Sequence, residues 1–291
     1  MNSTLILQSV FGGIMTGAVY ALLGVGFSLT WGVMKVINIS HAAFGLLGSF
    51  LAYTFLRKWG IDPVLSLAFS VPFLFFLACL IYRAIIVPIT KAKAVVVSSM
   101  ILTFGVAIIL ENLMLLIWGP DPRVLTPWYA SNVFILGPFY FQYPRLIGFG
   151  LSVIGISAIH FFLKRTFTGK AVRAAWQQSD AAQLYGINLK RISMISFGLA
   201  VGSAAVGGVG MAYLYSFEPY AHNFWLVNLF LVVIVGGVGN VLGTAAAGLI
   251  IGVITGLCLA FLPYQWVNPL TFGLLMVILL LRPEGLFRSE V

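Results

Sequence analysis

Apolar stretches of membrane-spanning length follow one another along almost the whole chain. About 20 apolar residues in a helix cross the hydrocarbon core of a bilayer. Nine stretches approach or exceed this length, although 42–56 and 225–238 are short, and they cover approximately residues 5–33, 42–56, 64–89, 95–118, 145–163, 192–216, 225–238, 241–262 and 267–281. We therefore predict an all-α polytopic membrane protein with one transmembrane domain over residues 1–291 and about eight to ten transmembrane or re-entrant helices.

The composition excludes the other broad classes of protein. Of the 291 residues, 61% are hydrophobic and only 8% are charged, whereas an average soluble domain has roughly 25% charged residues. So few polar side chains cannot cover the surface of a soluble protein, and a disordered chain is far less apolar. A transmembrane β-barrel would alternate apolar and polar residues in segments of about ten, and the sequence shows no such alternation.

The distribution of positive charge predicts the orientation of the segments. The formal net charge is +9, and membrane proteins retain Lys and Arg in their cytoplasmic loops. If the segments alternate and the hydrophilic segment 164–191 lies inside, the inner set is Lys35, Arg83, Lys91, Lys93, Lys164, Arg165, Lys170, Arg173, Lys190, Arg191, Arg282 and Arg288, and the outer set is Arg57, Lys58, Arg123 and Arg145. This predicts a cytoplasmic C-terminus and, unless a segment is re-entrant, an N-terminus outside.

Polar residues between the first two apolar stretches form the first candidate site. Residues 35–41 read Lys-Val-Ile-Asn-Ile-Ser-His. Non-helical backbone at membrane depth must be lined by protein or water, and broken helices are favoured places for substrate sites. Asn38, Ser40 and His41 are therefore candidates for a substrate pathway. The alternative is a tight cytoplasmic turn, with Lys35 at the headgroups and Asn38 and Ser40 capping the next helix.

Glu111 and Asn112 lie deep in the apolar stretch 95–118, nearer its outer end. An ionisable residue inside a span is costly and usually faces the bundle interior or an aqueous path. Both residues are therefore further candidates for the substrate pathway. The alternative is a structural role in which Glu111 is paired to a neighbouring helix.

The segment 164–191 is the only long hydrophilic stretch. Gly169 precedes a predicted short helix over 170–177, and Ser179 can cap a second one over 180–185, with Asp180 at its positive end. Gly186 then closes the second helix in the left-handed conformation. This cytoplasmic helical hairpin indicates a docking surface for a soluble partner, and the alternative is a basic loop without a partner.

Glycines mark two further features. Gly236, Gly237, Gly239 and Asn240 split the apolar region 225–262, and a hinge, a re-entrant tip and a plain turn all fit this pattern. Pairs of glycines four residues apart let helices approach closely in lipid, and we expect ordinary bundle packing from Gly13 and Gly17, Gly198 and Gly202, and Gly248, Gly252 and Gly256.

Prolines and aromatic residues mark the stretch 119–144. It holds five prolines and the aromatic residues Trp128, Tyr129, Tyr140 and Tyr143. This composition predicts an ordered loop at the membrane interface.

The sequence gives little support for an enzyme. Its three histidines (41, 160 and 222) are scattered, and there is no HExxH, GxSxG, GxGxxG or P-loop motif. We expect no catalytic residue, no metal site and no ATP site on this chain. A secondary carrier or channel would need paired intramembrane charges for ion coupling, and Glu111 alone is clearly inside a span. A structural scaffold would leave the polar residues at 38–41 unexplained.

Four motifs resemble one family over nearly the whole chain: the permease subunits of ABC importers for branched-chain amino acids, of the LivH type. The matching stretches are GV…VINISH at 32–41, GKAVRA at 169–174 with DAAQLYGIN at 180–188, GGVGNVLG at 236–243 and RPEGLF at 282–287. The chain departs from the family after His41, where Ala42 and Ala43 replace a common glycine and a frequent acidic residue.

The resemblance implies an inner-membrane importer subunit for leucine, isoleucine or valine that works by alternating access. Urea, short amides or other amino acids are the alternative cargoes. It implies that 169–188 is an ATPase coupling element and that residues 38–41 lie near the translocation path. The implied partners are two cytoplasmic ATPase subunits that hold ATP and Mg, a second permease subunit of the LivM type and a periplasmic or lipid-anchored binding protein. The coupling residues would be Gly169, Lys170, Arg173, Asp180, Ala182 and Gly186.

Overall fold

The computed structural model describes residues 3–89, 94–282 and 285–287. Each of the nine apolar stretches predicted from the sequence forms a helix, which confirms the all-α polytopic fold. These helices are α1 (Ser3–Met34), α2 (His41–Trp59), α3 (Pro63–Ile81), α5 (Val95–Trp118), α6 (Tyr143–Arg165), α9 (Leu189–Leu214), α10 (Ala221–Gly236), α11 (Val241–Phe261) and α12 (Val267–Leu281). Lys91, Lys93, Arg288 and, within the C-terminal motif, Pro283 and Glu284 lie outside the described residues.

Six of the described helical segments are long and apolar enough to cross a membrane. They are α1, α5, α6, α9, α11 and the segment Pro63–Ile86, in which α3 continues into the π-helical turn η1 (Tyr82–Ile86). The short helix α4 (Val87–Ile89) follows η1. The apolar helices α10 and α12 are shorter, and α2 starts directly after the polar stretch 35–40.

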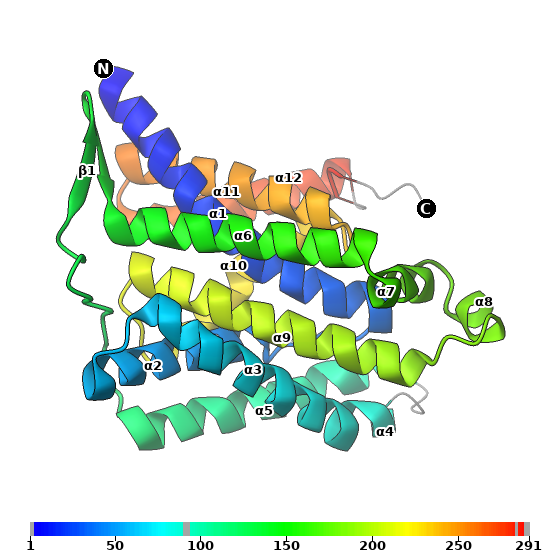
Figure 1. Ribbon diagram of the computed structural model, residues 1–291. Helices are drawn as coiled ribbons and strands as arrows, with labels where there is room; N and C mark the ends of the chain where they lie inside the picture. Colours follow the sequence, from blue (N-terminus) through cyan, green and yellow to red (C-terminus); the bar gives the residue numbers. More distant parts are fainter. Residues whose placement is uncertain (1–2, 90–93, 283–284, 288–291) are drawn as a thin grey trace.

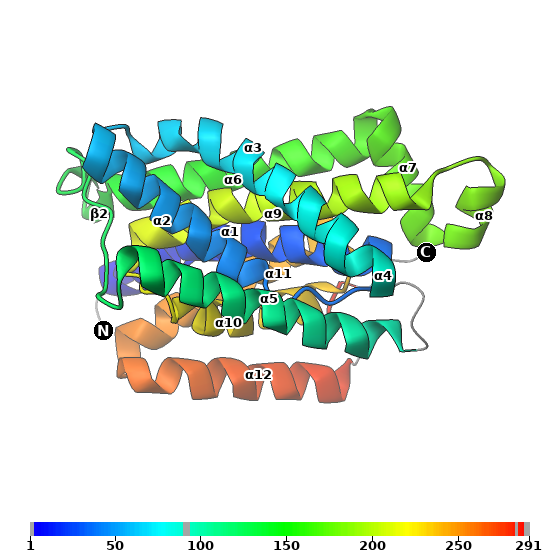
Figure 2. The same cartoon turned by 90° about the horizontal axis from the view of Figure 1, so that it is seen from below.

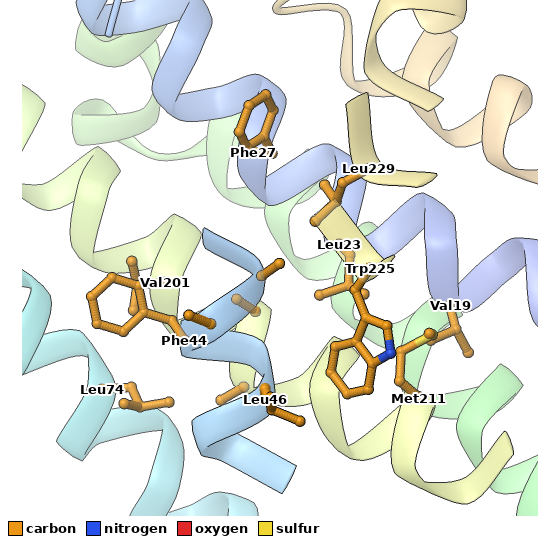
Figure 3. Packing of buried hydrophobic residues seen from close by; sticks show 14 of the residues in the cluster. Val19, Leu23, Phe27, Phe44, Leu46, Leu74, Val201, Met211, Trp225 and Leu229 are labelled. Carbon is orange, nitrogen blue, oxygen red and sulfur yellow. The ribbon is translucent and has the colours of Figure 1, made fainter. Parts of the chain in front are cut away.

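The long helices run roughly along one axis, and the start of α1 and the end of α12 lie at opposite ends of the bundle (Figures 1 and 2). Most of the length of α1 and α9 is buried, whereas α3, α5, α6 and α11 expose much of their surface. The core lies where α1, α2, α3, α9 and α10 meet, and Figure 3 shows Leu23, Phe44, Leu74, Val201 and Trp225 packed there.

Glycines let α1 and α11 touch backbone to backbone. A Cβ atom on Gly13 would lie 2.6 Å from the carbonyl oxygen of Gly252, and a Cβ atom on Gly17 would lie 2.6 Å from that of Gly248. A Cβ atom on Gly256 would likewise meet the backbone of Ser9. In lipid, where the hydrophobic effect does not drive helices together, such close contact is a main source of attraction. The prediction of glycine-mediated packing is therefore confirmed for these helices.

Two glycines of α9 pack against neighbouring helices, one against a side chain and one against the backbone. Gly198 faces the ring of Phe75 on α3, where an added Cβ atom would lie 2.7 Å from a ring carbon. Gly208 lies against the backbone of Gly45 on α2, where an added Cβ atom would overlap the carbonyl group. The hydroxyl of Ser49 donates to the carbonyl of Gly208 at 2.8 Å across the same contact. α9 is thus fixed to both α2 and α3.

The stretch 119–142 is ordered, as its composition predicts, but it also contains a β-hairpin that the sequence analysis missed. Strands β1 (Val133–Leu136) and β2 (Phe139–Gln142) pair antiparallel around Gly137, which has φ +59°. Both polar groups of the Gln8 side chain bond to the backbone of Tyr140, and this holds the hairpin against α1. Arg123 also exchanges two backbone hydrogen bonds with Phe217.

A tyrosine pair fixes the middle of the same stretch. The hydroxyls of Tyr129 and Tyr213 lie 2.7 Å apart, and both side chains are buried. Burial raises the pKa of Tyr129 to about 12, so its hydroxyl stays protonated and neutral at physiological pH. The pair therefore joins this loop to the end of α9 without burying a charge.

Basic residues gather at the end of the bundle that carries the segment 166–188. Among the described residues, this end has one acidic residue, Asp180, and the basic residues Lys35, Arg83, Lys164, Arg165, Lys170, Arg173, Lys190, Arg191 and Arg282. The opposite end has Asp62, Asp121 and Glu218 beside Arg57, Lys58, Arg123 and Arg145. The charge asymmetry expected from the sequence thus corresponds to two ends of the folded chain.

The α1–α11 contact predicts a large effect of one methyl group. Replacing Gly252 by Ala puts a Cβ atom into the backbone of Gly13 and Gly17, and we expect a loss of about 1–3 kcal/mol in the free energy of unfolding. The measurement is thermal unfolding of the purified protein in mild detergent. The matched control is Gly150→Ala on α6, where no atom lies within 4 Å of the new Cβ and a helical alanine is more stable than glycine. Equal melting temperatures for the two variants would contradict this account.

Candidate functional site

The polar stretch between α1 and α2 is a buried break in the helical structure. Lys35 ends α1 with φ +53°, the single positive φ among the described non-glycine residues, and its N–H donates to the carbonyl of Trp31 at 2.9 Å. Lys35 is exposed, but Val36, Asn38 and Ser40 are buried. The alternative in which Asn38 and Ser40 cap α2 is wrong, because the Ser40 hydroxyl donates to Oδ1 of Asn38 at 2.6 Å and no side chain caps the helix.

Two hydroxyl groups of α5 bind the backbone of this break. Oγ of Ser99 accepts a hydrogen bond from the N–H of Ile37 at 3.3 Å, and Oγ1 of Thr103 accepts one from the N–H of Ile39 at 3.0 Å. Non-helical backbone at membrane depth is tolerated only where protein or water satisfies it. Here α5 satisfies it, so the non-helical shape of residues 36–40 depends on a third helix.

The three side chains predicted for the substrate pathway at this break are fully buried, and two of them, Asn38 and Ser40, are joined by a hydrogen bond. Nδ2 of Asn38 has no hydrogen-bond partner among the described residues. The ring of His41 packs edge-on against Phe27 at 5.8 Å between ring centroids. Neither ring nitrogen makes a hydrogen bond of normal geometry there, and the Leu23 carbonyl is the acceptor beside the ring. Buried polar groups without partners are rare, so this cluster keeps hydrogen-bonding capacity in reserve.

Glu111 has a partner on another helix. Its Oε2 lies 2.6 Å from Nε2 of His222, at the start of α10, and the His222 side chain is 3% exposed against 20% for Glu111. The structural alternative, in which Glu111 pairs with a neighbouring helix, is therefore the arrangement observed. The sequence did not identify this partner, because His222 and Glu111 are 111 positions apart.

Asn112 does not join this pair. Its side chain is exposed, and its Nδ2 donates to the carbonyl of Ile108 within the same helix at 2.8 Å. Successive helical residues point about 100° apart, so Glu111 and Asn112 face different surroundings. A role for Asn112 in a substrate pathway stays a prediction.

The hydrophilic segment forms two helices, α7 (Phe167–Gln177) and α8 (Ser179–Leu184). The predicted start of the first helix is wrong. Thr166 caps α7 by accepting the N–H of Gly169 at 2.9 Å, so Gly169 lies inside the helix. A side chain at Gly169 would overlap the Phe162 carbonyl, which explains the glycine by the close approach of α7 to α6.

The second helix begins one residue earlier than predicted. Ser179 is its first residue and does not cap it; its hydroxyl lies 3.4 Å from Oδ1 of Asp180. Gly186 closes the helix with φ +80°, as predicted. Ala182 is buried, whereas Asp180 and Gly186 are exposed.

Apolar side chains project from this hydrophilic hairpin into solvent. Phe167 is 89% exposed, Leu184 89% and Tyr185 88%. The basic residues Lys170 and Arg173 are also exposed, on α7. α8 extends beyond the ends of the long helices in both views (Figures 1 and 2). An exposed group of large apolar side chains among charges is typical of a surface that another protein covers.

The glycine-rich stretch 236–240 is a turn between α10 and α11. Gly237 and Gly239 both have φ +81°, which other residues rarely adopt. Oδ1 of Asn240 caps α11 by accepting the N–H of Gly243 at 2.9 Å, while its Nδ2 donates to the carbonyl of Phe287 at 2.9 Å. The described part of the C-terminal motif therefore packs on this turn. A turn is the one of the three predicted alternatives that this geometry matches.

Three of the sequence motifs meet at one end of the bundle. A cavity of about 370 Å³ lies between the end of α1, the end of α6, α7 and the turn before α11; its lining includes Ser28, Gly32, Arg173, Trp176 and Asn240. The turn at residues 237–240 and α7 are thus neighbours of the end of α1, where the break begins. More than 200 positions separate this turn from the end of α1 in the sequence.

Several functional contacts were not predictable from the sequence. Ser99, Thr103 and His222 are among several polar residues of apolar helices, and nothing in the sequence pairs them with residues 37–39 or with Glu111. Trp176 is one aromatic residue in an amphipathic helix. A partial signal existed for His222, because a histidine near the start of an apolar stretch is as costly in a membrane as a carboxylate.

Six long apolar helices around a buried polar break, with a hydrophilic hairpin at one end, fit a multi-pass integral membrane protein, and the family comparison assigns it to the transport permeases. The chain belongs to the family described as branched-chain amino acid transport system / permease component, whose family model matches residues 9–280.

Three curated relatives illustrate the range of the family. The chain is 26% identical to the high-affinity branched-chain amino acid transport system permease protein LivH of Salmonella typhimurium, over 98% of this chain and 96% of the relative. It is 25% identical to the corresponding protein BraD of Pseudomonas aeruginosa, over 98% and 97%. It is 29% identical to the fructose import permease protein FrcC of Rhizobium meliloti, over 52% of this chain and 42% of the relative. No solved structure matches the chain.

The hydrogen bond from Ile39 to Thr103 predicts a stability cost for removing one hydroxyl. Thr103→Val keeps the side-chain shape but leaves the Ile39 N–H without an acceptor, and we expect a loss of about 1–3 kcal/mol in the free energy of unfolding. Thr103→Ser retains the hydroxyl and is the matched control. Thermal unfolding in detergent compares the two, and a valine variant as stable as the serine variant would contradict the contact.

The Glu111–His222 pair predicts non-additive effects of mutation. In a double-mutant cycle, Glu111→Ala and His222→Ala should together cost less than the sum of the single changes, by about 0.5–3 kcal/mol. The reason is that each single change leaves one buried polar group unpaired. The free energy of unfolding in detergent is the readout, and Asn112→Ala is the control. Strict additivity would show that the pair makes no net contribution.

Proposed function

We propose that this chain is a pore-forming subunit of an ATP-driven importer for leucine, isoleucine or valine. It would lie in the inner membrane of a bacterium and work by alternating access. The observation that carries the proposal is the α7–α8 hairpin, which presents exposed apolar side chains among basic ones at the end of a permease of this family. The names of the relatives LivH and BraD support the cargo.

The proposed partners supply ATP hydrolysis, the other half of the pathway and delivery of the cargo. ATP and Mg would be bound by two cytoplasmic ATPase subunits, which dock on the hairpin. A second related permease subunit would supply the other half of the pathway, and a binding protein would deliver the cargo at the opposite end. The basic end of the bundle would then be cytoplasmic, in agreement with the retention of Lys and Arg on that side.

The proposed coupling residues divide into two kinds. Gly169 and Ala182 are buried, so they shape the hairpin. Lys170, Arg173 and Asp180 are exposed and would meet the ATPase directly. Gly186, the sixth residue of the set, closes α8 and sets the direction in which the hairpin returns to α9.

The proposed pathway residues are Asn38, Ser40 and His41 at the break, with Glu111 and Asn112 of α5 as further candidates. A zwitterionic cargo loses hydration inside the bundle, and polar groups can replace that hydration for a short time without binding tightly. Nδ2 of Asn38, which has no partner among the described residues, has the capacity for this, and so has the imidazole of His41, which makes no hydrogen bond of normal geometry. Movement of α5 would be needed to open the break, since Ser99 and Thr103 hold its backbone.

A variant of the hairpin tip tests the docking surface. Leu184→Asp and Tyr185→Asp place charges on side chains that we expect to be covered, so the ATPase subunits should no longer co-purify with the tagged chain from native membranes. Mass spectrometry of the purified complex is the measurement. Trp128→Asp, at an 85% exposed indole in the loop at the other end, is the matched control and should keep the ATPase. Recovery of the ATPase with the tip variants would overturn the docking role of the hairpin.

Uptake by proteoliposomes containing the assembled importer tests the cargo. Radiolabelled leucine, isoleucine and valine should accumulate only with ATP and the binding protein. Fructose, urea and a basic amino acid are the competing cargoes, and fructose deserves inclusion because a fructose import permease is 29% identical over half of this chain. Accumulation of one of these compounds instead would show that it is the cargo, and it would not contradict ATP-driven import.

The Glu111–His222 pair favours a second candidate, an ATP-independent carrier. Such a carrier couples transport to protons or ions through ionisable groups inside the membrane, and Glu111 and His222 are two ionisable side chains in contact. The two candidates give opposite results with Glu111→Gln. A carrier would lose gradient-driven uptake, whereas the importer would keep uptake that depends on ATP.

A further inference from the structure

Trp176 joins three elements at the end of the bundle that carries the hairpin. Its indole lies beside Gly32 of α1 and Gly239 of the turn before α11. A Cβ atom on Gly32 would lie 3.3 Å from Nε1 of Trp176 and 3.0 Å from Cα of Gly239. A Cβ atom on Gly239 would overlap the indole ring. The ring therefore reaches both elements because each has a glycine at the contact.

The turn that Trp176 contacts is firmly attached to α1. The N–H of Gly239 donates to Oγ of Ser28 at 2.7 Å, and both groups are buried. The next residue, Asn240, caps α11. A displacement of the indole against Gly239 would therefore act on the start of α11 and on α1 together.

Two open cavities border the indole. Trp176 lines the cavity of about 370 Å³ next to α6 and α11, and it also lines a second cavity of about 500 Å³. The second cavity lies beside Lys35, Tyr82, Asp180 and Lys190, at the base of α8 and the start of α9. Lys35, Asp180 and Lys190 in its lining are exposed, so this second cavity is open to the surface. The indole therefore borders open space as well as the two glycines.

The contact with α1 lies directly before the buried break. Gly32 is three residues from Lys35, whose left-handed backbone ends α1, and residues 36–40 lead to His41. Movement of the end of α1 is thereby applied to the segment that holds Asn38 and Ser40.

We propose that Trp176 is a positioning residue that transmits movement of the α7–α8 hairpin to the end of α1 and to the turn 237–240. The inference rests on the proposed function, because it takes an ATPase seated on the hairpin as the source of the movement. It adds a specific contact, in which the indole packs against two glycines. Gly32 leads to the α1–α2 break, and Gly239 leads to α11.

The test uses the whole importer in proteoliposomes, with the binding protein added. The readout is the amount of cargo accumulated per ATP hydrolysed, measured together with the amount of bound ATPase. For Trp176→Ala we expect normal ATPase binding, continued ATP hydrolysis and a fall of about tenfold in cargo per ATP. Trp176→Phe keeps an aromatic ring and should recover a large part of the cargo accumulated per ATP. The value for Trp176→Leu should lie between those for the alanine and phenylalanine variants. The series keeps the test valid if the alanine variant does not fold.

Trp266→Ala is the matched control, because it removes a half-exposed indole at the other end of the bundle. Wild-type cargo per ATP in Trp176→Ala would overturn the inference and leave the proposed function standing. Loss of ATPase binding in Trp176→Ala would also overturn it, because Trp176 would then shape the docking surface. A wild-type chain that binds no ATPase, or that transports without ATP, would overturn the proposed function and with it this inference.

Discussion

The contact between α1 and α11 is the constraint on which the arrangement depends. In a lipid environment helices gain nothing from hiding apolar side chains from one another, so close backbone contact has to hold them together. Glycines on both helices allow it. α1 is thereby fixed along its length in the centre of the bundle, which sets the position of Ser28 and Gly32 near one end and of the break that follows.

Polar groups provide a second and more selective set of connections. α5 takes part in two of them: its hydroxyls bind the backbone between α1 and α2, and Glu111 binds His222 of α10. Thr103 and Glu111 are eight residues apart on α5, about 12 Å along the helix axis. One helix therefore links the buried break to the start of α10, and a rigid shift of α5 would affect both contacts at once.

The helices could be predicted from the sequence because each carries its own evidence, a run of apolar residues of the required length. The left-handed Gly186 and the turn at Gly237 and Gly239 were also predictable, since a single residue type determines those conformations. The partners of Glu111 and of the 36–40 backbone were not, because hydrogen bonds between residues 60 or more positions apart leave no local pattern. Side-chain capping failed at Ser40, whose backbone is already helical, and at Ser179, which lies inside the helix after Gln178. The β-hairpin was missed because both of its strands are only four residues long.

The side chain of Asn240 makes two hydrogen bonds, one as an acceptor and one as a donor. Its oxygen accepts from the first turn of α11, and its nitrogen donates to the carbonyl of Phe287. An aspartate would cap the helix equally well but would set its negative charge against that carbonyl, and a serine could reach one of the two groups. The carboxamide thus connects the beginning of α11 to the described residues that follow α12, so a rearrangement at the start of α11 would also displace Phe287.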